Sequence, residues 1–412
     1  MSLTHSAQGD LGQLLAQRTG RGRSDAIRQI LAAATAEGVL SLAGGIPTPD
    51  SFPVSRITAA MDRVMAGRAV TALQYAPTEG VPSMREALAR LASATGASVT
   101  ADQVLVTSGS QQGLDLIAQV LLDEGDSVAL EDPSYLGAVQ VFRRAGARLL
   151  PVPGDRDGMR TDILAERLSA GDRCKAVYVV PHFHNPTGSV LTPERRRHLA
   201  ELSDRYGFVI IEDDPYADLA FVGSRLPSTD LYGERVVRLL SLSKTLCPGL
   251  RVAGLVAPPA LIGELVTAKQ CSDLQTNTLG QYVLSELLAD PEFLPGHVRR
   301  LRQLYRSKAG ALAGLLHERL PWLSFDEPRG GLFLWCSITD PLVSADRLYP
   351  IALAEGVAFV PGSPFCVDRA GAQQLRLSYA SLDAAQRSKA VDRLSVAFGK
   401  ALADASRPDS RS

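Results

Sequence analysis

Residues 236–258, VVRLLSLSKTLCPGLRVAGLVAP, set a lysine between two apolar runs that are typical of β-strands. The lysine is Lys244, and Ser241, Ser243 and Arg251 lie close to it in the sequence. A lysine directly after an apolar strand is costly to bury unless it is paired, neutral or covalently used. Taken alone, SLSK is more often a structural stretch than a chemical one. Its meaning therefore depends on what the rest of the chain brings to the same place.

Short apolar strands alternate with helical stretches on both sides of this segment, between about residues 60 and 300. The predicted strands are 104–107, 127–132, 147–153, 175–181, 208–214, 236–244 and 253–258. Apolar strands separated by amphipathic helices predict an α/β fold, with a mostly parallel sheet covered by helices on both faces. In such sheets the ligand binds outside the carboxyl ends of the strands. The residues that follow each strand are therefore the candidates for a site.

The C-terminal part of the chain predicts a smaller α+β domain. A long charged helical stretch, about 285–318, leads into it, and strands and a last helix follow at 330–338, 356–362, 374–380 and 383–403. The SLAGG segment at 41–45 is expected to join this domain, and Ser24 to cap a helix over 25–36. We therefore divide the chain into an N-terminal segment that packs with the small domain, a large domain and a small domain, over residues 1–55, 56–300 and 301–412.

Composition excludes several classes of function. The chain of 412 residues has 43 Lys and Arg against 44 Asp and Glu, so no positive field draws it to nucleic acid or to a membrane surface. No apolar run is long enough to span a membrane, and residues 1–23 are polar, unlike a signal peptide. The five cysteines are scattered and form no CxxC pair, which favours free thiols in a cytoplasmic enzyme.

Two of the other strand ends carry polar residues that suit a bound anion or ring. Ser110 and Gln111 begin a helix directly after the strand 104–107, where free N–H groups and the helix dipole favour a phosphate. Many α/β proteins have a similar small-residue turn without a ligand. Asn185 begins the sequence NPTG after the strand 175–181; it is either part of a plain turn or a donor that faces the crevice.

A carboxylate and a phenol follow a third strand. Asp213 and Tyr216 lie three residues apart in EDDPY, just past the apolar run 208–211. A single carboxylate at a strand end is often only a helix cap. A carboxylate and a phenol directed at one aromatic ring is the alternative that would have a chemical function.

The motifs occur in a fixed order over about residues 24–400, and together they resemble a known family. They are SLAGGIPTPDSFP, LQYAPTEGVPSMREALA, VTSGSQQGLDL, EDPSYLG, HNPTG, EDDPY, SLSKTLCPGLRVAG and RLSYA. In this order the chain resembles the class I/II aminotransferases of pyridoxal-phosphate (PLP) fold type I. It is most similar to the 2-aminoadipate and multisubstrate aminotransferases, which are relatives of the effector domains of MocR regulators. The resemblance implies PLP as cofactor and transfer of an L-amino acid's α-amino group to a 2-oxo acid, with 2-oxoglutarate as the expected acceptor.

The resemblance also implies how the cofactor is held. Lys244 would bind PLP as a Schiff base and then carry out the 1,3-proton shift, and Asp213 would pair with the pyridine nitrogen. An opposite charge nearby stabilises the protonated ring, which makes it a better electron acceptor. The remaining cofactor contacts are assigned to Tyr216 and Asn185 at the phenolic oxygen, Tyr135 on the ring face, and Ser110, Gln111, Ser241, Ser243 and Arg251 at the phosphate.

Substrate and partner contacts follow from the same resemblance. Arg376, in RLSYA, would grip the α-carboxylate through its planar fork, while Asn185 and the backbone around Gly44 and Gly45 would also contact the substrate. Tyr75, in LQYAPTEG, would reach the phosphate of the partner subunit, so we expect a homodimer with active sites at the interface. For a second substrate carboxylate, Arg23 or Arg28 is a candidate by analogy with the aminoadipate enzymes.

Three departures and alternatives stay open at this point. His182 and His184 stand where relatives often have Asn and Gln; on a strand their rings would share a face, but no third metal ligand is evident, so we expect no metal site. Cys247 and Cys366 are expected to be packing residues. The same cofactor site would also serve a β-lyase, a decarboxylase or an oxidase, or a non-catalytic PLP-binding sensor, although no room for a DNA-binding domain precedes SLAGG.

Overall fold

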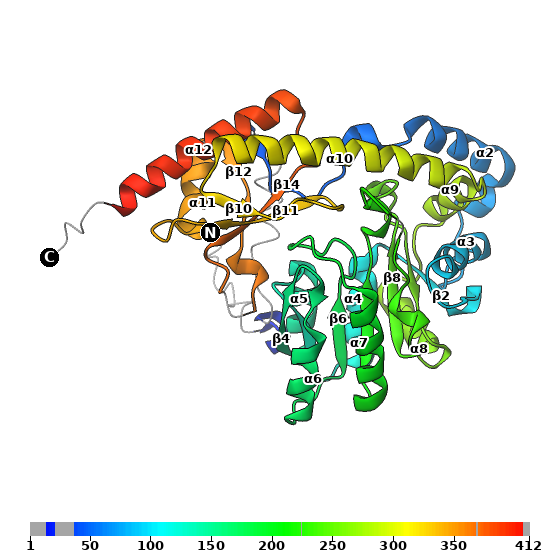
Figure 1. Ribbon diagram of the computed structural model, residues 1–412. Helices are drawn as coiled ribbons and strands as arrows, with labels where there is room; N and C mark the ends of the chain where they lie inside the picture. The colour runs from blue at the N-terminus through cyan, green and yellow to red at the C-terminus, as the bar shows by residue number, and fades with distance from the viewer. Residues whose placement is uncertain (1–13, 21–36, 224, 368–369, 407–412) are drawn as a thin grey trace, which may run out of the picture.

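The computed structural model describes residues 14–20, 37–223, 225–367 and 370–406. Its largest element is an eight-stranded sheet (Figure 1) in the order β2-β9-β8-β7-β6-β3-β4-β5. The strands are β2 (Val104–Thr107), β3 (Ser127–Asp132), β4 (Arg148–Asp155), β5 (Gly158–Met159), β6 (Ala176–Val179), β7 (Val209–Asp213), β8 (Val236–Ser241) and β9 (Ala253–Val256). Each predicted strand of this region is present, with shorter bounds in most cases.

The sheet is mixed but mostly parallel, as predicted. The strands β8, β7, β6, β3 and β4 run parallel, whereas β9 runs antiparallel to both of its neighbours and β5 antiparallel to β4. Because β9 returns in the opposite direction to β8, their connection, residues 242–252, lies at the carboxyl edge of the parallel strands. That one connection carries both Lys244 and Arg251.

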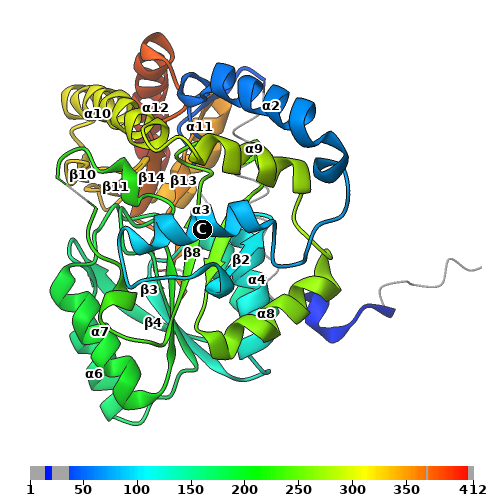
Figure 2. The ribbon, with the colours of Figure 1, turned by 90° about the vertical axis from the view of Figure 1, so that its right-hand side faces the viewer.

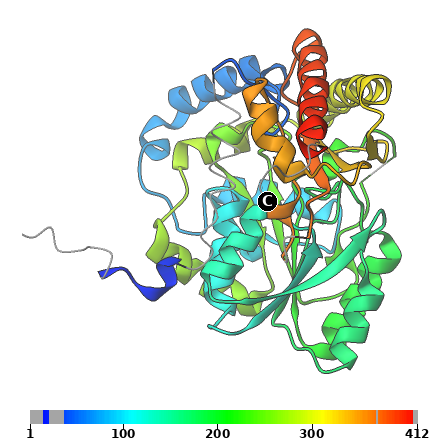
Figure 3. The same cartoon turned by 90° about the vertical axis from the view of Figure 1, so that its left-hand side faces the viewer.

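Helices cover both faces of the sheet, and Figures 2 and 3 view them from opposite sides. Alternation along the strands decides the packing: Leu105 joins a cluster with α4 (Ser110–Leu121) and α5 (Leu136–Arg144), whereas Val104 and Val106 pack toward α3 (Pro82–Ser93). The remaining helices of this part are α2 (Val54–Ala72), α6 (Thr161–Ser169), α7 (Pro193–Tyr206), α8 (Pro259–Ser272) and α9 (Thr278–Leu288).

The C-terminal part is the smaller α+β unit that the sequence predicted. Its four-stranded antiparallel sheet has the order β10-β11-β14-β13, from β10 (Leu323–Phe325), β11 (Phe333–Ile338), β13 (Val360–Pro361) and β14 (Gln374–Ser378). The helices are α10 (Phe293–Arg319), α11 (Ala345–Ala354) and α12 (Ala384–Ala405). The SLAGG segment joins this unit as expected, because β1 (Leu40–Ser41) pairs in parallel with β12 (Val357–Ala358).

Two predicted elements are wrong in detail. The helical stretch 285–318 is two helices, α9 and α10, with a break at residues 289–292. Pro291 lies in this break, where it lacks a backbone N–H and disfavours helical geometry at Asp290. The predicted strand 356–362 is also divided, and its halves, β12 and β13, belong to different sheets.

The predicted helix over 25–36 lies outside the described residues, as do Arg23 and Arg28. Among the residues that are described, none of the helices combines the length and the apolarity needed to cross a membrane.

Candidate functional site

Thirteen of the fourteen site residues predicted from the sequence line one cavity. The cavity has a volume of about 320 Å³ and lies at the carboxyl edge of the large sheet, where the smaller unit meets it. Its walls include Gly44, Gly45, Ser110, Gln111, Tyr135, Asn185, Asp213, Tyr216, Ser241, Ser243, Lys244, Arg251 and Arg376. The remaining predicted residue, Tyr75, is not in this wall; its side chain is 76% exposed after α2.

Lys244 is one of these wall residues, and its Nζ donates a hydrogen bond of 2.9 Å to the carbonyl oxygen of Gly45. Burial lowers the pKa of Lys244 to about 8, with help from the positive charges of Arg376 and Arg251. At mildly basic pH a substantial fraction of the amine is therefore uncharged. An uncharged lysine amine can act as a nucleophile and as a base.

Asp213 ends β7 with one oxygen bonded and one free. Its Oδ2 accepts a 2.9 Å hydrogen bond from the Tyr178 hydroxyl, while its buried Oδ1 has no partner. Burial raises the pKa of Asp213 to about 7, and the neighbouring Asp214 adds to the rise. A buried carboxylate oxygen without a partner is costly unless a ligand donates to it. The cavity therefore has a place for a donor, such as a protonated ring nitrogen.

The N-terminus of α4 forms one end of the cavity. The Oγ of Ser110 is buried there without a partner, and Arg251 approaches from the β8–β9 connection, donating to the carbonyl oxygen of Ser108 over 3.0 Å. Between them, Gly109 has a φ of +92°, and a Cβ there would lie 2.2 Å from the Arg251 guanidinium. Only glycine fits such a position. Free helix N–H groups, a hydroxyl and a guanidinium suit a phosphate group.

Tyr135 is held at the start of α5 by Gln111. Its hydroxyl donates to Gln111 Oε1 over 3.2 Å, while Gln111 Nε2 donates to the carbonyl oxygen of Gly137. A Cβ at Gly137 would lie 2.6 Å from the Tyr135 ring, so a glycine at this position leaves space for the ring. The Tyr135 ring therefore forms a fixed aromatic wall next to the end of the cavity that suits a phosphate group.

Arg376 comes from β14 in the small unit and is buried, with 5% exposure. It donates to Asn185 Oδ1 over 2.6 Å and to the carbonyl oxygen of Ala43 over 2.7 Å, and its Nε has no partner. No ion pair with a carboxylate is found for it in the described part of the chain. Its guanidinium carbon lies 4.1 Å from the centre of the Phe333 ring. Burial lowers the pKa of Arg376 to about 10, which leaves it cationic at neutral pH.

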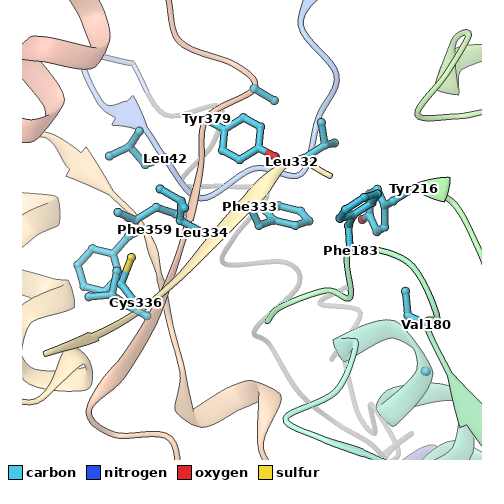
Figure 4. Close-up of a cluster of buried hydrophobic side chains, with 14 of the residues drawn as sticks. Leu42, Val180, Phe183, Tyr216, Leu332, Phe333, Leu334, Cys336, Phe359 and Tyr379 are labelled. Atoms are coloured by element: carbon cyan, nitrogen blue, oxygen red, sulfur yellow. The ribbon is translucent and has the colours of Figure 1, made fainter. Parts of the chain in front are cut away.

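Phe333 and Phe365 also line the cavity, and neither was predicted from the sequence. Figure 4 shows Phe333, from β11, beside Tyr216; their rings meet edge to face at 6.1 Å. Burial raises the pKa of Tyr216, so its hydroxyl stays protonated. A Cβ at Gly45 would lie 2.7 Å from Phe333, which explains the glycine. Both phenylalanines lie in apolar runs that look like ordinary core, so the sequence held no signal for them.

The two histidines do not share a face, contrary to the strand prediction, because β6 ends at Val179. His182 Nδ1 lies 3.1 Å from Asp214 and its Nε2 lies 3.2 Å from Arg196, so it is a satisfied core imidazole. His184 Nδ1 instead bonds the Thr187 hydroxyl, and burial lowers its pKa to about 3. The described residues contain no group of three or more side chains suited to a metal.

A second and larger cavity, of about 620 Å³, lies next to the first and shares the Phe333 wall. It lies between the loops 154–157 and 326–330; in its wall, Asp155 accepts a hydrogen bond from Arg195, and Arg329 donates one to the carbonyl oxygen of Arg156. Except for Phe333 it shares no wall residue with the cavity around Lys244, and none of the predicted site residues lines it.

Comparison with known proteins gives a consistent picture. The family model described as aminotransferase class I and II matches residues 37–394. The 2-aminoadipate transaminase of Thermus thermophilus is 41% identical over 390 residues, which cover 93% of this chain and 96% of that protein. The aromatic-amino-acid aminotransferase 1 of Thermococcus litoralis is 34% identical over 365 residues, 87% of each chain. The crystal structure of the Thermus thermophilus α-aminoadipate aminotransferase, complexed with N-(5'-phosphopyridoxyl)-L-leucine, superimposes with a TM-score of 0.89 at 39% identity, covering 96% of this chain and 100% of that one.

Proposed function

This chain belongs to the class I and II aminotransferases and uses PLP as its cofactor, and we propose that it moves the α-amino group of an L-amino acid to 2-oxoglutarate. The observation that carries the proposal is one cavity holding a lysine with a lowered pKa, a carboxylate oxygen without a partner, and an unpaired hydroxyl at a helix N-terminus. These three features match the aldehyde, ring nitrogen and phosphate of PLP.

We assign the cofactor contacts as follows. Ser110, Gln111, Ser241, Ser243 and Arg251 would bind the phosphate, and Asp213 Oδ1 would accept a hydrogen bond from the protonated ring nitrogen. Tyr135 covers one face of the ring, and Asn185 and Tyr216 hold its phenolic oxygen. When bound, PLP supplies an electron sink that stabilises a carbanion at the substrate Cα. The ion pair with Asp213 keeps the ring positively charged, which strengthens that sink.

Lys244 has two functions in this proposal. Its amine first holds the cofactor's aldehyde carbon, which requires the uncharged form that its lowered pKa provides. Once the substrate's amine has displaced it, Nζ would accept the proton from Cα. It would then return that proton to the cofactor's former aldehyde carbon, which completes the 1,3-proton shift. Since Nζ lies 2.9 Å from the Gly45 carbonyl oxygen, the SLAGG segment helps to keep the free amine above the site.

Substrate orientation falls to Arg376 and the SLAGG segment. The partners of Arg376 are an amide and a carbonyl, and each is neutral. A carboxylate entering the cavity therefore meets a cation that has no counter-charge in the described residues. A bidentate pair there fixes the Cα–H bond relative to the cofactor plane, which is the orientation the proton transfer needs.

A donor screen tests the reaction class. Holoenzyme is incubated with single L-amino acids, with and without 2-oxoglutarate, and glutamate, ammonia, carbon dioxide and peroxide are measured. We expect glutamate to form at many turnovers per active site only when the oxo acid is present. Sustained ammonia, carbon dioxide or peroxide without oxo acid would assign the enzyme to the lyase, decarboxylase or oxidase class. Cofactor binding without turnover of any donor would favour the sensor alternative.

We also propose a cytoplasmic homodimer in which Tyr75 completes the partner's phosphate site. Several apolar side chains near Tyr75 are exposed: Val70, Leu73 and Leu274, at 84%, 67% and 47%. The loop of Tyr75 is tied to that of Leu274, because the Ala76 backbone N–H donates to Gln275 Oε1. Exposed apolar side chains gathered around one loop are typical of a surface that a partner covers.

Subunit mixing tests this assembly. Tyr75→Ala is expected to weaken PLP retention and Lys244→Ala to be inactive, but a hybrid dimer regains one site with both native residues. Equal mixing after reversible dissociation should therefore restore about a quarter of the wild-type activity at limiting PLP. The unmixed variants are the controls. An active monomer by light scattering at assay concentration, or no recovery in proven hybrids, would contradict the proposal.

A further inference from the structure

We propose that Tyr178 is a positioning residue for the reaction: its hydroxyl occupies one oxygen of Asp213 and so holds the other, in ionised form, toward the cofactor's ring nitrogen. The inference rests on the function proposed for Asp213 above. Nothing in the sequence distinguished Tyr178, which lies inside the apolar run KAVYVVP. Its hydroxyl is the one polar side-chain group in the strand β6, whose other residues are Ala and Val.

The sheet register brings the two side chains together. Tyr178 on β6 pairs with Ile211 on the parallel neighbour β7, and Asp213 lies two residues beyond Ile211. Residues two apart in a strand project from the same face. Tyr178 and Asp213 therefore both point to the α4–α5 side of the sheet, where the cavity lies, and the 2.9 Å hydrogen bond follows from this register.

The phenol has little freedom to act otherwise. Tyr178 has no exposed surface, and the ring of Phe142, on α5, packs against it edge to face at 5.7 Å. Burial raises the pKa of Tyr178 well above its ordinary value, so the hydroxyl stays protonated and donates a hydrogen bond to Asp213. Breaking this bond would leave a hydroxyl buried without an acceptor, which is unfavourable. The hydrogen bond from Tyr178 thus fixes the orientation of the Asp213 carboxylate before any cofactor binds.

Several ionisable groups act on Asp213, and Tyr178 is the neutral donor among them. Facing it are Tyr178 from β6, Lys244 from the β8–β9 connection, Tyr135 at the start of α5, and Asp214 and Tyr216 after β7. Burial and Asp214 raise the pKa of Asp213, whereas the Tyr178 hydrogen bond and Lys244 lower it. Without the phenol, Asp213 becomes a stronger base and draws the proton away from the ring nitrogen. The ring then loses positive charge and becomes a weaker electron acceptor.

Tyr178→Phe tests this in the holoenzyme with PLP labelled with ¹⁵N in the ring. We expect the ring-nitrogen resonance to move toward the unprotonated position relative to wild type. We also expect kcat to fall about 10- to 100-fold, the effect of a hydrogen bond to a charged group, with little change in KM. Because the pKa of Asp213 rises, the acid limb of the kcat profile should move to higher pH. A resonance and a pH profile unchanged from wild type would overturn the proposal.

Two further variants separate the possible causes. Tyr305→Phe removes an equally buried hydroxyl, which bonds the backbone of Thr48 and lies outside the cavity wall, and should leave the resonance unchanged. Incorporation of 3-fluorotyrosine at position 178 preserves the shape but makes a better donor, so the acid limb should move to lower pH; this covers the case in which the phenylalanine variant does not fold. A shift in the wrong direction, or an equal effect in Tyr305→Phe, would count against the inference.

Asp213→Asn distinguishes failure of this inference from failure of the proposed function. If Asp213→Asn changes the ¹⁵N resonance but Tyr178→Phe does not, Asp213 keeps its function and the inference about Tyr178 is wrong. If Asp213→Asn itself leaves the resonance as in wild type, the assignment of Asp213 fails, and the inference that depends on it fails too.

Discussion

Lys244→Ala is expected to abolish transamination while PLP still binds without a covalent link. The variant loses the amine that holds the cofactor and the base that moves the Cα proton. General acid–base catalysis alone typically contributes about 10²- to 10⁴-fold, so a loss of kcat at least that large should appear. Ser110, Arg251 and Asp213 remain, and they bind groups of PLP that are remote from the aldehyde.

Peptide mapping and a control lysine make this test specific. Borohydride reduction of wild type should fix the cofactor on the peptide that contains Lys244, and reduction of Lys244→Ala should fix none. Lys308→Met removes a part-buried lysine of α10 that donates to the Leu382 carbonyl oxygen, and should leave both label and turnover intact. A label on a different lysine, such as the fully buried Lys269, would contradict the assignment.

Arg376→Leu should lose about 10²- to 10³-fold in kcat/KM toward every α-amino acid donor, and still bind PLP. Removing one member of a desolvated charge pair typically costs about 3–5 kcal/mol, and about 1.4 kcal/mol corresponds to a tenfold change. The loss should be independent of the donor's side chain, because the α-carboxylate is common to all donors. Steady-state kinetics with three donors of different size would measure it, with cofactor absorbance as the check on PLP.

The conservative variant and a control separate recognition from folding. Arg376→Lys should recover only part of the activity, since an ammonium group cannot bond a carboxylate through a planar fork. Arg387→Leu removes another buried arginine, on α12, which bonds the Leu382 carbonyl oxygen, and should affect stability without changing KM. A leucine variant at position 376 with near-normal kcat/KM would refute the assignment. One that lost PLP or unfolded would indicate a structural role.

Residue types at strand ends made most of the site predictable. The strands were visible from their apolar runs, and the carboxyl ends of parallel strands meet at one edge, so Ser110, Asn185, Asp213 and Lys244 were expected together. The reversed direction of β9 was not predictable, because an apolar run has the same pattern in either direction. Pro291 indicates the break before α10, but the helical pattern on both sides of it led to the prediction of one continuous helix.

The parts that were missed depend on tertiary contacts alone. Tyr178 and Phe333 lie in apolar strands, where a tyrosine or phenylalanine is ordinary core, and only the pairing of neighbouring strands brings them to the cavity. His182 and His184 were expected on one face because the strand was extended too far. Alternation holds only while the strand lasts, and here it ended three residues before His182.

The pairing of β1 with β12 also sets an order of events during synthesis. Leu40 meets Val357, and Ala43 meets Arg376, so these contacts join residues from opposite ends of the chain. The last strand of the large sheet, β9, ends at Val256, and a ribosome releases it long before it releases Arg376. The residues of one subunit that are assigned to the cofactor are thus all in the nascent chain while Arg376, the residue assigned to the α-carboxylate, is still untranslated. Binding of the carboxylate that all donors share is the last property of the site that the growing polypeptide acquires.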